Sequence, residues 1–108
     1  MAKKGCITNE IYSVKGHIID EYCLTKGIII EHNNKVYSCT LNQTDIDANK
    51  NKFYIMQLIK TSDSKYVFYT RWGRISEKGR PTLEYFSAET DGILSFEKQF
   101  KVKTGNVW

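Results

Sequence analysis

Two runs of apolar and aromatic residues stand out in the middle of the chain, FYIMQLIK at 53–60 and KYVFYTRW at 65–72. Both are rich in β-branched and aromatic side chains, the composition of half-buried strands. A short polar segment, TSDS at 61–64, separates them, and a loop of that length between two such runs is typical of a β-hairpin. The pattern therefore predicts an antiparallel pair of strands.

Shorter segments predict further strands on both sides of this hairpin. Residues 36–41 alternate with period two, short apolar segments at 17–19 and 28–30 precede them, and TLEYFS follows at 82–87. The polar, asparagine-rich stretch 42–52 shows no apolar periodicity, so it is predicted to be a loop or a frayed helical turn.

Three positions carry turn signals. HNNK at 32–35 predicts a turn between short strands, and Gly79 supplies a permissive backbone for a second hairpin after residue 72. Pro81 lacks a backbone N–H, so we expect it to stop the pairing before TLEYFS resumes.

The last segment changes period. Three apolar residues recur at i, i+3 and i+7 with charged residues between them: Ile93, Phe96 and Phe100. This spacing predicts an amphipathic helix over residues 90–103. Thr90 or Ser87 is expected to cap its start, and Gly105 to end it.

Together these elements predict an α+β fold, an antiparallel β-sheet of about four to five strands with one C-terminal α-helix packed across a face. Residues 1–10 contain little that could pack and predict a flexible N-terminal arm; residues 11–108 predict a single domain. No apolar run is long enough to span a membrane and no secretory signal is present, so we expect a soluble intracellular protein with no membrane partner.

Charge is concentrated in one part of the chain. The formal net charge is +4, yet residues 50–80 contain eight basic and two acidic residues, so the remainder is slightly negative. A positive block on a near-neutral body favours an anionic partner, of which phosphate backbones are the commonest, although a merely solvated basic face stays open.

Catalytic and metal-binding patterns are missing from the sequence. No phosphate-binding glycine loop, zinc-protease or nucleophile-elbow motif occurs, and two histidines offer little for acid–base chemistry. Three widely spaced cysteines predict reduced thiols in buried or edge positions: Cys6, Cys23 and Cys39. We therefore predict a binding protein with no catalytic residue, metal site or cofactor.

The stretch RWGR at 71–74 places an indole between two guanidinium groups. On a strand continuing through Gly73, Trp72 and Arg74 fall on one face and Arg71 on the other. An indole offers a flat surface to a sugar or base, a guanidinium grips phosphate oxygens, and a glycine lets another backbone approach. The alternative is a core tryptophan with Arg74 in an ion pair facing the helix.

Here the chain also resembles a known family. RWGRI, preceded by NKFYIMQLI and FYT and followed by FEKQFKVKTGNVW, resembles the WGR domain of the DNA-dependent poly(ADP-ribose) polymerases, nuclear enzymes that sense DNA breaks. The resemblance runs from about residue 36 to residue 108, and VYSCTLNQTDIDANKNKFYIMQL is similar to the smaller, zinc-finger-free members. The triplet alone is a weak signal, but together with LNQT, NKFY and KTGNVW in order it is strong.

The resemblance implies a module that packs against a DNA end or nick, favours a 5′-phosphate and relays binding to a helical regulatory subdomain of the transferase. It also implies a nuclear location. By position, Trp72 would lie against the sugar of the terminal nucleotide, Arg74 would contact DNA and partner together, and Asn51 and Lys52 would face the same side. The full predicted nucleic-acid contact set is Trp72, Arg74, Asn51, Lys52, Lys78 and Arg80.

The sequence departs from the family pattern at three positions. Ser76 stands where glycine usually follows the triplet, which predicts a different and looser turn. Asp47 replaces a glutamine used at the partner interface and weakens the expectation of a relay, whereas Arg80 adds positive charge where glutamine is frequent. Two functions therefore stay open: a DNA-end reader that regulates a transferase, and a WGR-type protein–protein scaffold without DNA binding.

Overall fold

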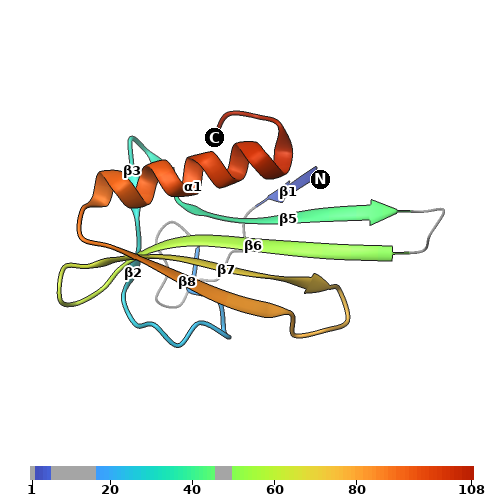
Figure 1. The fold of residues 1–108 in the computed structure, drawn as a ribbon, viewed down its shortest axis with the longest axis horizontal. Coiled ribbons are helices and arrows are strands. Elements are labelled where there is room, and N and C mark those ends of the chain that lie inside the picture. Colours follow the sequence, from blue (N-terminus) through green and yellow to red (C-terminus); the bar gives the residue numbers. More distant parts are fainter. Residues whose placement is uncertain (1, 6–16, 46–49) are drawn as a thin grey trace.

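The computed structural model describes residues 2–5, 17–45 and 50–108 (Figure 1). Its elements, in chain order, are β1 (Ala2–Gly5), β2 (Ile28–Ile29), β3 (Glu31–His32), β4 (Lys35–Val36), β5 (Ser38–Asp45), β6 (Lys50–Lys60), β7 (Tyr66–Arg74), β8 (Arg80–Phe86) and α1 (Glu89–Thr104). Of the arm predicted over residues 1–10, Ala2–Gly5 is described, and it pairs with β5 as β1.

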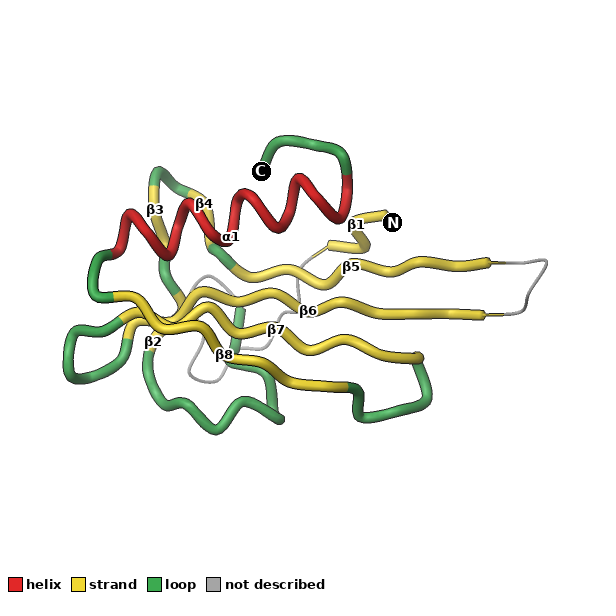
Figure 2. The backbone as a smooth tube through the Cα atoms, viewed as in Figure 1, coloured by secondary structure: helices red, strands yellow, loops and turns green. Residues whose placement is uncertain are grey.

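The sheet is antiparallel throughout, with the order β1-β5-β6-β7-β8, and β2 pairs with the end of β6 that β5 leaves open. The turn at Asn33–Asn34 joins β3 and β4 into a separate small sheet, and both asparagines have positive φ. Helix α1 crosses one face of the main sheet (Figure 2). These features confirm the predicted α+β class with one C-terminal helix.

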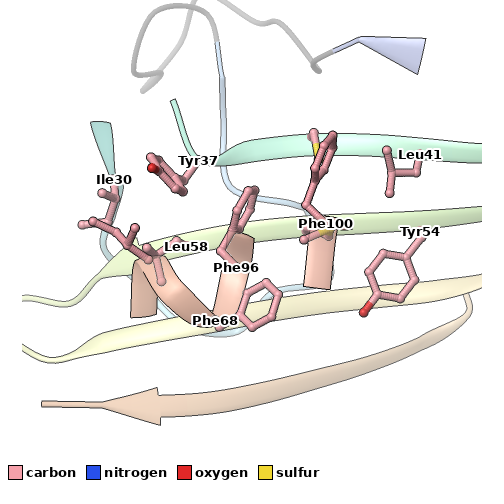
Figure 3. Close-up of a cluster of buried hydrophobic side chains, with 11 residues drawn as sticks. Ile30, Tyr37, Leu41, Tyr54, Leu58, Phe68, Phe96 and Phe100 are labelled. Atoms are coloured by element: carbon pink, nitrogen blue, oxygen red, sulfur yellow. The ribbon is translucent and has the colours of Figure 1, made fainter. Parts of the chain in front are cut away.

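The main core lies between α1 and the sheet. Phe96 and Phe100 reach from the helix towards Phe68 and Tyr54 of the strands (Figure 3). Phe96 is fully buried, and its ring lies 5.7 Å from that of Phe68. The period-3.6 pattern of the helix is thus confirmed, because its apolar stripe covers this face.

The opposite face of the sheet is covered by the irregular segment before β2. Ile19 and Cys23 pack against a second buried cluster on β6 and β7, formed by Phe53, Ile55, Ile59 and Tyr69. The predicted strand at 17–19 is wrong except for a bridge at His17, because the segment crosses this face as an irregular chain with a turn at residues 21–22. Cys39 is buried in the main core; Cys6 lies outside the described residues.

Three local predictions are corrected. The loop expected over 42–52 is largely strand, since the ladder between β5 and β6 extends to the pair Asp45–Lys50. Pro81 does not stop the pairing: it lies opposite Arg71 in β8, which among the described strands pairs with β7 alone and, as an edge strand, can tolerate a missing N–H. Helix α1 begins after Ala88, which provides no side-chain cap, but it ends at Gly105 as predicted.

Candidate nucleic-acid interface

Strand β7 places Trp72 on the helix side of the sheet, near the loop that joins β7 to β8. Trp72 lies opposite Tyr54 of β6, and the two rings stack with centroids 5.9 Å apart and an angle of 25° between their planes. The Trp72 residue is 37% exposed. The sequence left two alternatives for Trp72, a core residue and a solvent-exposed one. The structure supports a solvent-exposed indole whose ring packs on that of Tyr54.

Cationic side chains gather around this stack. Lys52 pairs with Arg74 in the register of β6 and β7, and Arg80 pairs with Trp72 across β7 and β8. Directly opposed residues share a face, so these three cations lie on the Trp72 side of the sheet. Lys103 from the last turn of α1 adds a fourth, with its Nζ 4.7 Å from the centre of the Tyr54 ring.

A groove of about 340 Å³ opens at this end of the sheet. It is lined by Gln43, Lys52, Phe53, Tyr54, Trp72, Gly73, Arg74, Glu77 and Lys103. Three cations face one carboxylate there, beside an exposed aromatic surface. This combination suits a phosphate attached to a flat or sugar-like group.

A second groove of about 460 Å³ lies between α1 and the β7–β8 hairpin, and it shares Tyr54 and Trp72 with the first. Its charged lining residues are Glu84 and Lys98, so it carries no excess of positive charge. Of these two grooves, only the first is therefore lined by more cations than carboxylates.

Two residues of the predicted contact set lie apart from the others. Asn51 precedes Lys52 on β6, so its side chain falls on the opposite face, and its carbonyl accepts a hydrogen bond from the Ile75 N–H at 3.1 Å. The Lys78 Nζ lies 5.2 Å from the centre of the Tyr22 ring, towards the segment that covers the second face. The structure thus brings together Trp72, Arg74, Lys52 and Arg80.

Arg71 faces away from the groove and is buried in an ion pair. Its Nε donates to Asp20 Oδ2 at 2.8 Å and its Nη2 to Asp20 Oδ1 at 3.1 Å, a two-pronged contact. The guanidinium carbon lies 4.5 Å from the centre of the Tyr22 ring and 4.8 Å from that of Phe53. Arg71 is therefore a structural residue, whereas Arg74 is exposed at the end of β7.

The Asp20 carboxylate also accepts a hydrogen bond from the Tyr69 hydroxyl at 2.5 Å. Burial works to raise the pKa of Asp20, but the hydrogen bonds from Arg71 and Tyr69 and the charge of Arg71 outweigh it and hold that pKa below its ordinary value. The pKa of Tyr69 is raised by burial and by its hydrogen bond to Asp20. Asp20 is thus a stabilised anion.

The loop after Arg74 is tightly packed. A Cβ on Gly73 would lie 2.8 Å from the Cα of Gly79, and one on Gly79 would lie 2.4 Å from the carbonyl oxygen of Trp72. The close backbone approach that Gly73 permits is thus used by the chain's own hairpin. Ser76 is not among the described non-glycine residues with positive φ, so its turn does not require glycine.

Sequence reasoning missed Lys103, Gln43 and Asp20. Lys103 is recognisable in the sequence only as a basic residue near the end of the predicted helix, and no local pattern shows that the last turn of α1 ends above Tyr54. Gln43 lay in the predicted loop. Asp20 lies 51 positions from Arg71 along the chain, a pairing that a single sequence does not reveal.

Comparison with known proteins shows the same domain. A family model described as the WGR domain matches residues 37–108. This chain belongs to the WGR domain family. It is 46% identical over 72 residues to the protein mono-ADP-ribosyltransferase PARP3 of Homo sapiens, a match that covers 67% of this chain and 14% of that protein. It is 35% identical over 94 residues to the poly [ADP-ribose] polymerase 2-A of Oryza sativa subsp. japonica, covering 85% of this chain and 13% of the relative.

A third relative, the poly [ADP-ribose] polymerase 1 of Xenopus laevis, is 37% identical over 82 residues, covering 74% of this chain and 8% of the relative. The chain therefore spans about a seventh or less of the length of these relatives, and the match to the WGR family model covers its residues 37–108. In the described part of the chain, no helix has the length and apolar character that crossing a membrane requires. Nor do the described residues include a cluster of three or more metal-ligating side chains.

Proposed function

We propose that this WGR domain binds DNA ends or nicks and that it prefers a 5′-phosphorylated terminus. The observation that carries the proposal is the partly exposed Trp72, stacked on Tyr54 beside a groove lined by Lys52, Arg74 and Lys103. An end, unlike continuous duplex, exposes a terminal sugar and base to an aromatic surface, and a terminal phosphate carries more charge than an internal one.

The roles of the side chains follow from their chemistry. The exposed face of Trp72 covers the sugar or base of the terminal nucleotide. The Arg74 guanidinium grips phosphate oxygens with two donors, and the Lys52 and Lys103 ammonium groups add point charges at the same groove. Arg80, opposite Trp72, extends the positive surface along β8.

The relatives are named as ADP-ribosyltransferases and polymerases, and we propose that the domain transmits DNA binding to such a transferase region. Arg74 is exposed at the end of β7, where it can contact a partner domain as well as DNA. Asp47, the substitution expected to weaken this relay, lies outside the described residues.

The test is fluorescence anisotropy of the 108-residue chain with a labelled duplex, with and without a 5′-phosphate, at two salt concentrations. We expect the phosphate to tighten binding and salt to weaken it, with a slope of log affinity on log salt of roughly −0.9 per neutralised phosphate. Affinity indifferent to both would refute the proposal.

Matched variants locate the site. Lys52→Ala should weaken binding, whereas Lys65→Ala, the same loss of charge at the other end of the β6–β7 hairpin, should not. Arg74→Lys keeps the charge but loses the two-pronged grip, so we expect weaker binding with an unchanged salt slope. Equal affinities for wild type and Arg74→Lys would show that the site is wrongly placed.

A protein–protein scaffold is the second candidate, and a feature of β8 favours it. Leu83 and Tyr85 are 41% and 64% exposed on this edge strand, on the face away from α1. Adjacent exposed apolar residues on an open edge fit a protein contact. A folded sample that fails to bind DNA at low salt would favour this function.

A further inference from the structure

A buried glutamine of β6 helps to hold the backbone of the segment before β2 on the sheet. Gln57, in the middle of β6, is fully buried; its Oε1 accepts a hydrogen bond from the Asp20 N–H at 2.8 Å, and its Nε2 donates to the Ile18 carbonyl at 2.7 Å. Both bonds involve the backbone of the segment. The backbone of the segment is therefore held on the sheet by bonds that do not involve the Asp20 side chain.

From this fixed backbone the Asp20 carboxylate reaches Arg71, and Arg71 in turn reaches the loop between β7 and β8. Two of the three guanidinium nitrogens bond to Asp20, and the third, Nη1, donates to the backbone carbonyl of Lys78. A guanidinium is planar, so fixing two nitrogens fixes the direction of the third. Asp20 thus determines where Arg71 can hold the Lys78 backbone.

Lys78 precedes Gly79, whose backbone packs against both Gly73 and the Trp72 carbonyl. A shift of Lys78 would therefore move the residues that lie against the Trp72–Gly73–Arg74 backbone. Two aromatic rings, Tyr22 and Phe53, pack against the Arg71 guanidinium and leave it little freedom to take another position.

We propose that Asp20 is a positioning residue for the nucleic-acid site: acting through Arg71, it sets the loop at residues 75–79 and so the alignment of Trp72 and Arg74. The inference rests on the proposed function. Asp20 is 8% exposed and does not line the groove, so it makes no contact with DNA itself. It also lies before residues 37–108, so the site depends on a residue outside the family match.

The test compares Asp20→Asn with Tyr69→Phe in the 108-residue chain. Both changes remove part of the same buried network, but Tyr69→Phe leaves the two bonds between Asp20 and Arg71 in place. Circular dichroism and urea unfolding define a temperature at which wild type and both variants are fully folded. At that temperature, amide hydrogen exchange is measured at residues 75–80 and in α1, and affinity is measured for 5′-phosphorylated duplex.

For Asp20→Asn we expect faster exchange at residues 75–80 with α1 unchanged, and affinity about 3- to 10-fold weaker because a loosened loop must be ordered on binding. Tyr69→Phe should retain wild-type exchange in the loop and affinity within about twofold. An Asp20→Asn variant with a wild-type loop and affinity would overturn the proposal, as would equal losses in both variants.

Failure of the proposed function gives a different result. If the wild-type chain does not bind the duplex, the proposed function is refuted, and with it any effect of Asp20 on DNA binding. The hydrogen-exchange rates at residues 75–80 then still decide whether Asp20 positions the loop. Should Asp20→Asn unfold, Arg71→Lys replaces it, because lysine keeps the charge but cannot bond to Asp20 and the Lys78 carbonyl in the same arrangement.

Discussion

The indole of Trp72 stacks on the ring of Tyr54, its direct cross-strand neighbour, and Lys103 lies over that same tyrosine ring. Tyr54 itself is buried in the main core, and its hydroxyl accepts a hydrogen bond from Gln99 Nε2 at 3.1 Å. The aromatic surface offered to a ligand is therefore anchored to the interior by a residue that cannot move freely.

This arrangement predicts that Trp72→Ala separates folding from binding. Because Trp72 is more than a third exposed, we expect a loss of about 1–2 kcal/mol in the free energy of unfolding, well below the ~3–5 kcal/mol typical of a buried aromatic. DNA affinity should fall by about 1–3 kcal/mol if the indole stacks on a nucleotide. Urea unfolding and anisotropy measure the two losses, and Phe96→Ala serves as the fully buried control. A stability loss in Trp72→Ala as large as in Phe96→Ala would mean that the residue belongs to the core.

Lys103 gives a prediction that sequence reasoning did not suggest. Lys103→Gln should reduce the steepness of the salt dependence by about 0.9 if its ammonium neutralises one phosphate. Lys101→Gln is the matched control, because it removes the same charge two residues earlier on an exposed part of α1. Anisotropy titrations at four or more salt concentrations give both slopes. Identical salt slopes for the two variants would mean that Lys103 neutralises no phosphate.

The fold was predictable because its signals are local. The β-branched and aromatic composition of residues 53–60 and 65–72 predicted two paired strands, and the spacing of Ile93, Phe96 and Phe100 predicted one buried face of a helix; both predictions were confirmed. The polar stretch 42–52 was wrongly predicted to be a loop. Strand ends that extend beyond the core pair through their backbones and need no apolar alternation. The edge position of β8 likewise made Pro81 harmless.

The candidate site was only partly predictable because it combines parts distant in sequence. Period two placed Trp72 and Arg74 on one face, which the strand confirms as far as residue 74. The positions of Lys103 above Tyr54 and of Asp20 against Arg71 depend on how α1 and the segment before β2 cross the sheet. Such crossings are set by packing over the whole core, and a single sequence carries no local signal for them.

Gly79 and Gly105 allow backbone strain to be separated from steric contact. Both have positive φ, 79° and 75°, but a Cβ on Gly79 would collide with the Trp72 carbonyl whereas one on Gly105 would meet nothing within 4 Å. Gly105→Ala should therefore cost about 1–2 kcal/mol of stability and leave DNA affinity unchanged. Gly79→Ala should cost more and also weaken DNA binding, because the β7–β8 loop must shift away from Trp72. Thermal unfolding measures the loss of stability, and anisotropy measures DNA affinity. Equal losses of stability in Gly79→Ala and Gly105→Ala would contradict the close contact between Gly79 and the Trp72 carbonyl.

The ion pair between Asp20 and Arg71 predicts how stability depends on pH. Since the pKa of Asp20 is held below its ordinary value of 3.8 in the folded protein, the unfolded chain binds the proton more readily. The contribution of Asp20 is therefore fully present above about pH 4–5 and is lost as the pH falls through the lower folded pKa.

Asp20→Asn should remove that contribution at every pH. At pH 7 we expect a loss of about 3 kcal/mol, because the change leaves the buried Arg71 without its counter-charge. On acidification the wild type should lose stability more steeply than the variant, so that the difference between their urea midpoints shrinks below pH 4. Exposed Asp63, paired with Thr61 in the turn between β6 and β7, supplies the control: Asp63→Asn should leave the midpoint at pH 7 nearly unchanged. A constant difference between wild type and Asp20→Asn from pH 7 to pH 2 would show that Asp20 does not titrate in the way its contacts require.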